Sequence, residues 1–231
     1  MSAGRIRPRV LVTAGPTQEP LDPVRFLSNH STGYLGYAIA RQAARRGHRV
    51  TLITGPTMLP PPAVHHMIAV VTTRQMLGAL RREFPRCDWL FMTAAVADFR
   101  PRLVHRGKLK KDTAPSVLRL TLVRNPDLLS TVTRRKGRRL VVGWTLETGR
   151  LLAAARAKRA AKRMDLVVGH QLTRASAPFG PRPMRAVLVD REGTVTRLPS
   201  LRKERLAAIL LDKAQALWYR GANVDTASRC C

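Results

Sequence analysis

The residues best suited to chemistry lie in one loop near the N-terminus. Residues 13–36 are rich in Gly, Pro, Ser and Asn, and residues 29–32 (Asn-His-Ser-Thr) come directly before Gly33. An apolar run, residues 9–13, precedes this loop, and a helix-like pattern, residues 37–46, follows it. In α/β proteins a strand, a loop and a helix in this order present backbone N–H groups to phosphate. Because small polar residues at a helix start can cap it, bind an anion or do both, we expect function to lie in this loop.

Two later segments carry further polar groups. Residues 93–100 (TAAVADFR) have small side chains that let a flat ligand approach the backbone, and Asp98 could accept hydrogen bonds from a ribose or a base. A tight turn with a solvated Asp98 explains the same residues equally well. Lys108, Lys110 and Lys111 put three ammonium groups in a flexible loop. In so basic a chain, a solvated run is the default interpretation of these lysines.

Two more patterns fit both a structural and a binding role. Asn125 and Pro126 predict the start of a helix, as the N-cap and the first helical residue. That start would also leave backbone donors for a phosphate. Lys158 and Lys162 are four residues apart and would share one helix face. Alone, this pair indicates surface lysines.

Alternating elements must position these loops. Apolar runs predict strands at residues 9–13, 49–54, 67–71, 89–92, 118–123, 140–144, 166–169, 186–190 and 194–198. Amphipathic patterns predict helices at residues 34–46, 73–83, 126–134, 150–163 and 201–219. This order predicts a three-layer, Rossmann-like α/β fold: a mostly parallel sheet with helices on both faces and an antiparallel hairpin edge at residues 187–195. Ligands of such sheets bind outside the carboxyl ends of the strands, where all these loops begin.

Length and composition indicate a single domain. The 231 residues divide into a basic N-terminal tail (1–8), one domain (9–220) and a C-terminal tail (221–231). No apolar run approaches a membrane span, and the N-terminus lacks the apolar region of a secretory signal. Cys87, Cys230 and Cys231 form neither a disulfide framework nor a metal-ligand spacing, which fits a reducing cytoplasm.

The formal charge of +28 has three interpretations. It indicates nucleic-acid binding, a polyanionic small substrate, or a biased composition that places Arg on every exposed face. The basic residues are spread along the chain, and no aromatic residue is interleaved with a basic run. Charge alone therefore does not decide the function.

Taken together, these segments resemble phosphopantothenoylcysteine synthetase (phosphopantothenate–cysteine ligase), a family of coenzyme A biosynthesis. The resemblance covers residues 9–217 and keeps the family order. The pieces AVAD and KLKK are similar to the bacterial branch, which implies CTP rather than ATP. The matching blocks are residues 13–36, 54–56 (TGP), 94–100 (AAVADFR), 108–111 (KLKK), 125–129 (NPDLL) and 141–148 (VVGWTLET).

The resemblance implies a ligation in two steps. The carboxylate of 4′-phosphopantothenate attacks the α-phosphate of CTP, which gives an acyl cytidylate and pyrophosphate. The amine of cysteine then attacks the activated carbonyl and releases CMP. Neither step needs a covalent enzyme intermediate, so catalysis would come from positioning and charge stabilisation. Mg²⁺ would be carried by the triphosphate, with no metal site on the protein.

Individual roles follow from the same resemblance. Asn29 would hold the acyl cytidylate, and Lys108, on a mobile flap, would neutralise phosphate charge; these two are the expected catalytic residues. The substrate phosphate would be bound by Ser31, Thr32 and Gly33. The nucleotide would contact Ala94, Asp98, Lys108, Pro126, Asp127, Leu128, Leu129, Trp144, Lys158 and Lys162.

Several positions depart from the family pattern. Tyr34 stands where many relatives carry a basic residue, and Trp144 replaces the usual Phe. Leu146 is bulkier than the usual Ala, Gly169-His170 stands where Ala-Asn is typical, and Arg185 falls near a usual Asn. These departures leave open how active the chain is.

The resemblance also implies partners. The family is dimeric, which predicts a homodimer paired through the sheet edge. Bacterial relatives are often fused to an N-terminal flavin-dependent decarboxylase. This sequence starts close to the first strand, so we expect it to lack that activity and to work with a separate decarboxylase, if any.

Two alternatives belong to other classes. An NAD(P)-binding oxidoreductase or epimerase would carry G-x-G-x-x-G after the first strand, where this chain has Ala14-Gly15-Pro16. A non-catalytic relative could instead use the same fold and its basic surface to bind nucleic acid or another polyanion.

Overall fold

The computed structural model describes residues 7–112, 116–173 and 179–227, with side chains as far as residue 220. The first six residues of the predicted N-terminal tail and the Cys230–Cys231 pair lie outside the described residues. In the part of the chain that is described, no helix combines the length and the apolar character needed to cross a membrane.

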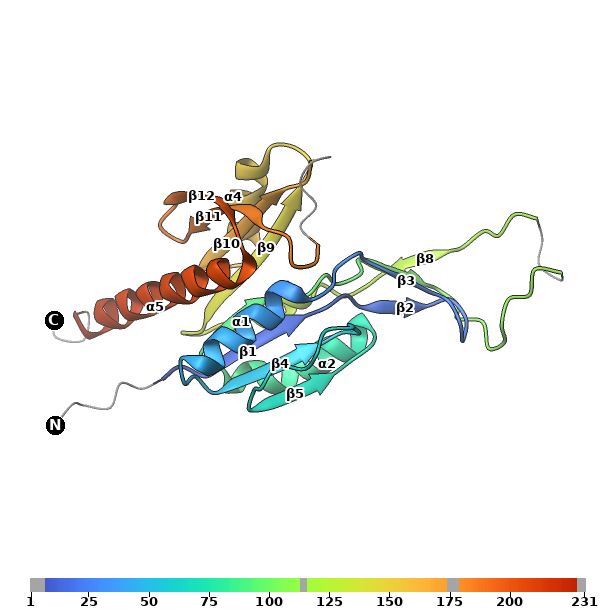
Figure 1. Ribbon diagram of the computed structural model, residues 1–231, viewed down its shortest axis with the longest axis horizontal. Helices are drawn as coiled ribbons and strands as arrows, with labels where there is room; N and C mark the ends of the chain where they lie inside the picture. The colour runs from blue at the N-terminus through green and yellow to red at the C-terminus, as the bar shows by residue number, and fades with distance from the viewer. Residues whose placement is uncertain (1–6, 113–115, 174–178, 228–231) are drawn as a thin grey trace.

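An eight-stranded sheet forms the centre of the molecule, in the order β12-β11-β10-β9-β6-β1-β4-β5 (Figure 1). From β10 to β5 all neighbours are parallel, while β11 and β12 pair antiparallel at one edge. The predicted sheet and hairpin edge are therefore confirmed. The strands are β1 (Val10–Ala14), β4 (Val50–Thr54), β5 (His66–Ala69), β6 (Trp89–Met92), β9 (Leu140–Glu147), β10 (Leu166–Gln171), β11 (Met184–Asp190) and β12 (Val195–Leu201).

Helices cover both faces of the sheet and give it three layers. On one face, α1 (Tyr34–Arg45) and α5 (Lys203–Ala227) pack on a core that includes Val10 and Val12. On the other face, Leu11 joins a second core under α2 (Thr73–Glu83), the short helix η1 (Phe84–Arg86), α3 (Leu128–Thr133) and α4 (Leu151–Ala161). Successive side chains of a strand point to opposite faces, so the fully buried β1 contributes to both cores.

A slender arm projects from the sheet beside the carboxyl ends of its central strands (Figure 1). We define the arm as residues 18–28, 99–112 and 116–124. It contains two antiparallel ribbons, β2 (Gln18–Pro20) with β3 (Phe26–Ser28) and β7 (Phe99–Pro101) with β8 (Leu122–Arg124). The strand predicted at residues 118–123 is therefore wrong in extent, because only residues 122–124 form a strand, and they pair with β7 outside the main sheet.

Two predicted helix ends need correction, at the start of α3 and the end of α5, while α1 begins at Tyr34 as predicted. The N-cap of α3 is Asp127, whose Oδ1 accepts a hydrogen bond from the N–H of Ser130 at 2.9 Å, so Asn125 does not cap this helix. The N-cap of α1 is Gly33, and no side chain caps that helix. The backbone of α5 stays helical to Ala227, past the predicted end at residue 219. The boundary of the C-terminal tail at residue 221 stays a prediction.

Candidate functional site

A cleft of about 950 Å³ opens at the carboxyl ends of the central strands. Along the sheet, β1 lies between β4 and β6, and the chain order runs outward from it in both directions. Such a reversal leaves a crevice in which open α/β sheets bind ligands. The walls come from the loops after β1 and β6, the start of α1, the segment before α3, the end of β9, and parts of α4 and α5.

The loop after β1 enters the cleft through a glycine turn. Gly33 has φ 77°, in the left-handed region, and an added Cβ would lie 2.9 Å from the backbone nitrogen of Gly15. This geometry favours glycine and aims the first turn of α1 at the cleft. Nearby, Asn29 donates a hydrogen bond from Nδ2 to the carbonyl oxygen of Ala95 at 3.0 Å. The loops after β1 and β6 are thus linked directly across the switch point.

A lysine–carboxylate group forms the opposite wall. Lys162 forms an ion pair with Asp127 and donates a hydrogen bond to Oγ of Ser130 at 2.9 Å. Burial raises the pKa of Asp127, but the hydrogen bonds from Lys162 and Ser130 outweigh it and lower that pKa overall. Burial also lowers the pKa of Lys158, against nearby carboxylates that include Glu147. This wall therefore combines two ammonium groups, which can pair with anions, with carboxylates, which can accept hydrogen bonds.

Asn125 joins three segments beneath this wall. Its Nδ2 donates to the carbonyl oxygen of Ala97 at 2.9 Å and to Oγ1 of Thr73 at 3.3 Å. Its Oδ1 accepts from Arg100 at 3.1 Å, and its backbone N–H donates to the carbonyl oxygen of Asp98 at 2.8 Å. The side chain therefore fixes the loop after β6, instead of capping α3 as the sequence predicted.

The departures from the family pattern fall in and around the cleft. Trp144 and His170 line it, and so does Leu146, whose side chain is exposed. The Nε1 atom of Trp144 is buried and has no hydrogen-bond partner among the described residues. Buried His170 makes a hydrogen bond of 2.6 Å between Nδ1 and the carbonyl oxygen of Arg185, whose own side chain is exposed.

The cleft brings together nearly all the residues predicted for the site. Lys108 is the exception. It lies in the arm and is not among the cleft-lining residues. Its neighbour Leu109 donates a backbone hydrogen bond to Asp22 at 3.1 Å. The predicted residues that line the cleft are Asn29, Ser31, Thr32, Gly33, Ala94, Asp98, Pro126, Asp127, Leu128, Leu129, Trp144, Lys158 and Lys162.

The cleft also contains residues that the sequence did not single out. Glu147, Phe179 and Lys203 line it. Glu147 accepts a hydrogen bond from Oγ1 of Thr145 at 2.6 Å, which holds its carboxylate beside Lys158. Lys203 lies in a charged run, residues 202–205, and such a run in the sequence indicates a solvent-exposed face rather than a buried lysine. Among the described residues, no three or more His, Cys, Asp or Glu side chains come together in a way that could hold a metal ion.

These features define a three-layer α/β protein whose strand-end loops enclose a basic ligand cleft. The chain belongs to the family described as DNA/pantothenate metabolism flavoprotein C-terminal domain, which it matches over residues 6–217. It is 39% identical over 206 residues to the coenzyme A biosynthesis bifunctional protein CoaBC of Escherichia coli K12, covering 88% of this chain and 50% of that protein. It is 40% identical over 223 residues to CoaBC of Mycobacterium bovis, covering 91% of this chain and 52% of that protein.

Solved structures show the same fold. The crystal structure of the C-terminal domain of a CoaBC protein superposes with a TM-score of 0.78 at 32% identity, covering 92% of this chain and 96% of that one. A Cab2 H337A mutant in complex with phosphopantothenate-cysteine has a TM-score of 0.72 at 18% identity, covering 94% and 88% of the two chains, and shares the fold. The chain spans about half the length of the curated relatives it matches.

Proposed function

We propose that the chain is a ligase that joins 4′-phosphopantothenate to L-cysteine, a step of coenzyme A biosynthesis. The observation that carries this proposal is the single cleft in which thirteen predicted residues meet, drawn from four of the matching sequence blocks and from the Lys158–Lys162 pair. Membership of a family whose relatives include coenzyme A biosynthesis proteins supports it.

In the proposed reaction, CTP binds along the wall formed by Asp127, Lys158 and Lys162. The two ammonium groups balance phosphate charge, and Mg²⁺ bound to the triphosphate neutralises the remainder. The substrate carboxylate attacks the α-phosphate and pyrophosphate leaves. Asn29, fixed by its bond to Ala95, holds the acyl cytidylate while the cysteine amine displaces CMP.

The test is pyrophosphate release by purified protein. We expect release only when 4′-phosphopantothenate, CTP and Mg²⁺ are present, and phosphopantothenoylcysteine only when cysteine is added. ATP replaces CTP in a parallel reaction to establish the nucleotide preference. Asn29→Ala should let the acyl cytidylate accumulate, seen by quenched-flow mass spectrometry. No product with either nucleotide would reject the proposal, and unchanged turnover without an intermediate would reject the role of Asn29 alone.

We also propose that the chain works as a homodimer. Most of the exposed large apolar side chains of the described residues lie on the arm, at Val24, Phe26, Phe99, Leu103, Val104, Val117, Leu118, Leu120 and Leu122. An exposed apolar surface of this kind is typical of an interface. It favours pairing through the arm over the sheet edge that the sequence predicted. Pairing there would also put Lys108 next to a second chain, where it could complete a site.

Sedimentation measures this pairing. We expect a dimer for the unmodified protein and a monomer for the double variant Phe26→Ser/Leu122→Ser. Met58→Ser/Val71→Ser removes exposed apolar groups outside the arm and serves as the matched control. If the arm variant is still a dimer, the interface lies outside the arm.

The basic surface favours one alternative function, a non-catalytic relative that binds nucleic acid or another polyanion. Filter binding across salt concentrations tests it, because nonspecific nucleic-acid binding falls steeply as salt rises. Strong binding at physiological salt together with an inactive cleft would favour this alternative.

A further inference from the structure

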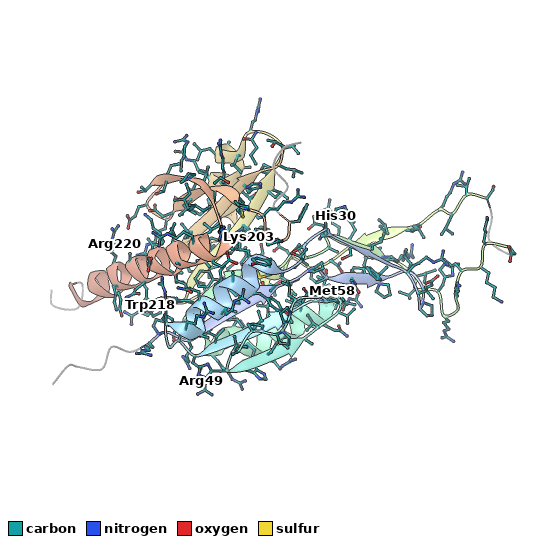
Figure 2. All side chains as sticks on the ribbon, viewed as in Figure 1. His30, Arg49, Met58, Lys203, Trp218 and Arg220 are labelled. Atoms are coloured by element: carbon teal, nitrogen blue, oxygen red, sulfur yellow. The ribbon has the colours of Figure 1, made fainter. Side chains whose placement is uncertain are left out.

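A second pocket opens at the amino ends of the central strands, away from the cleft. Its volume is about 540 Å³, within the range of about 300–1,000 Å³ that is usual for small-molecule sites. Its walls come from the starts of β1, β4 and β5 and from the segment between α2 and β6. Figure 2 shows Arg49, which lines this pocket, far from His30 in the loop after β1. We call it the amino-end pocket, and its charged and imidazole side chains are those of Arg9, Arg49, His65, His66, Glu83 and Arg86.

Histidines distinguish the amino-end pocket from the rest of the basic surface. The chain has six histidines, and two of them, His65 and His66, line this pocket beside three arginines. A composition biased toward arginine would put guanidinium groups on every exposed face, but it would not gather histidines in a hollow. Nδ1 of His65 accepts a hydrogen bond from the N–H of Val50 at 3.3 Å. The proton of the neutral ring is therefore on Nε2, which can donate to a ligand.

Backbone hydrogen bonds of the sheet fix the positions of two of the arginines. The N–H of Val10 donates to the carbonyl oxygen of Arg49 at 2.8 Å, and the N–H of Asp88 donates to the carbonyl oxygen of Arg9 at 2.9 Å. These bonds hold the starts of β4, β1 and β6 side by side. Groups carried on regular elements are positioned more precisely than groups on loops. The backbone of this pocket is therefore in place before a ligand binds.

The ion pairs around the pocket leave one guanidinium group for a ligand. Arg9 forms an ion pair with Asp88 at 3.3 Å, and Arg86 forms one with Glu83 at 3.6 Å. The side chain of Arg49 forms neither an ion pair nor a hydrogen bond with any other residue that the structure describes. A guanidinium group carries five N–H donors and stays protonated, so Arg49 offers both a charge and hydrogen bonds.

The remaining groups of the pocket are compatible with an anion. Burial raises the pKa of Cys87 to about 12, so its thiol carries no negative charge at neutral pH. The carboxyl end of α2 would repel an anion, but carbonyl oxygens there already accept hydrogen bonds. The oxygen of Leu80 accepts from the N–H of Phe84, and the oxygen of Phe84 accepts from the N–H of Cys87 at 3.3 Å. Thr51 also lines the pocket, and its hydroxyl group can donate.

We propose that the amino-end pocket binds the phosphate group of a small phosphorylated metabolite, with Arg49 as its principal cation. The planar guanidinium group matches the spacing of two phosphate oxygens, and Nε2 of His65 and the hydroxyl group of Thr51 supply neutral donors. The volume of the pocket leaves room for the organic part of such a molecule. This inference does not depend on the ligase proposal, which concerns the cleft at the other end of the strands.

An NMR titration of the full chain with inorganic phosphate tests the inference. The backbone amide of Thr51 reports on the pocket, and that of Gly33 reports separately on the cleft. We expect a saturable shift of the Thr51 amide. Arg49→Gln should weaken this binding about 10- to 100-fold, the usual effect of losing a charge-assisted hydrogen bond. Arg82→Gln removes the same charge from the last turn of α2, outside the pocket, and should change the affinity less than about twofold.

Two further measurements separate the pocket from general attraction to the basic surface. Ribose 5-phosphate, which adds an organic part, should bind at least as tightly as inorganic phosphate. Arg49→Lys keeps the charge and should retain more affinity than Arg49→Gln, which a purely structural role of Arg49 would not produce. Circular dichroism checks that both variants are folded.

Each contrary outcome overturns the inference. If phosphate shifts the Gly33 amide but not the Thr51 amide, the pocket is not an anion site, and the ligase proposal is unaffected. Equal weakening by Arg49→Gln and Arg82→Gln would mean that phosphate responds only to the overall charge. A short DNA duplex that binds more tightly than ribose 5-phosphate, with shifts spread over the basic surface, would assign this face to nucleic acid instead.

Discussion

Among the described residues that line the cleft, only Trp144 has a buried side-chain nitrogen or oxygen without a hydrogen-bond partner. Its ring contributes a flat surface beside the lysine wall, yet its buried Nε1 finds no partner among the described residues. An unpaired buried donor costs about 1–3 kcal/mol, so the Nε1 atom of this indole does not contribute to stability. An aromatic face of this kind is what a nucleobase stacks on.

Exchanges at Trp144 test this role. Trp144→Phe keeps the ring and removes the unpaired donor, so we expect the free energy of unfolding to stay equal or rise by about 1 kcal/mol. Trp144→Ala removes the stacking surface and should weaken CTP binding about tenfold. Chemical denaturation and calorimetry measure the two effects. An Ala variant that binds CTP as well as the Phe variant would contradict the stacking role.

The position of a residue in the cleft followed from the sequence where a motif fixed its neighbours, and did not elsewhere. Asp98 and Asp127 both reach the cleft, as expected. Asn125 reaches it too, but it joins Thr73, Ala97 and Arg100, and the sequence carries no sign of those partners because they come from distant segments. Lys203 was missed because its burial depends on α5 packing beside α1, which a local pattern does not record.

Strands and helices were predicted correctly where a buried face gives the sequence a regular pattern of apolar residues. The central strands are four or more residues long and largely apolar, so their runs stand out. The arm has no such signal: β2, β3, β7 and β8 are three residues each, and most of their side chains are at least partly exposed. β7 pairs with β8 across the long segment between Pro101 and Leu122. Short turn motifs predict hairpins with loops of a few residues, so they do not predict this pairing.

Asp22 holds the arm together. Its buried carboxylate accepts backbone hydrogen bonds from Val24 at 2.8 Å, Arg25 at 2.7 Å and Leu109 at 3.1 Å. Desolvation raises the pKa of Asp22, but these N–H groups and the charge of Arg25 lower it more, to about 2. The carboxylate therefore anchors the loop that carries Lys108.

Asp22→Asn tests this anchor. A carboxyl group whose pKa is lowered by folding stabilises the folded state above its unfolded pKa near 3.8, and that contribution is lost as pH falls toward 2. We expect the variant to melt at a lower temperature at pH 7, and the difference to shrink between pH 4 and pH 2. Hydrogen exchange at the amide of Leu109 should be at least tenfold faster in the variant at pH 7. Equal exchange would show that Asp22 does not anchor the loop.

Charge is a property of the whole molecule. The formal charge of +28 is spread over a small surface, so the basic side chains repel one another and destabilise the compact state. Salt screens this repulsion, with a Debye length that falls from about 30 Å at 0.01 M to about 8 Å at 0.15 M.

We therefore expect the melting temperature to rise with sodium chloride over this range. Each kcal/mol of repulsion removed should add about 2–4 °C for a chain of this size. Scanning calorimetry measures the shift, and sucrose at equal osmolality is the control for solvent exclusion. A melting temperature that falls with salt would mean that ion pairs such as Arg46–Asp212 outweigh the repulsion.

The arm consists of two separate segments of the chain, one with β2 and β3 and one with β7 and β8, and after each segment the chain returns to the body of the molecule. A protease cut after Lys110 would leave β1, β4, β5 and β6 on one fragment and β9 to β12 on the other, with the seam between β6 and β9. Each half would carry an uncovered strand edge that only the other half matches. We therefore expect two separately produced fragments, divided after Lys110, to associate through β6 and β9. Recovery of ligand binding on mixing the fragments measures this association.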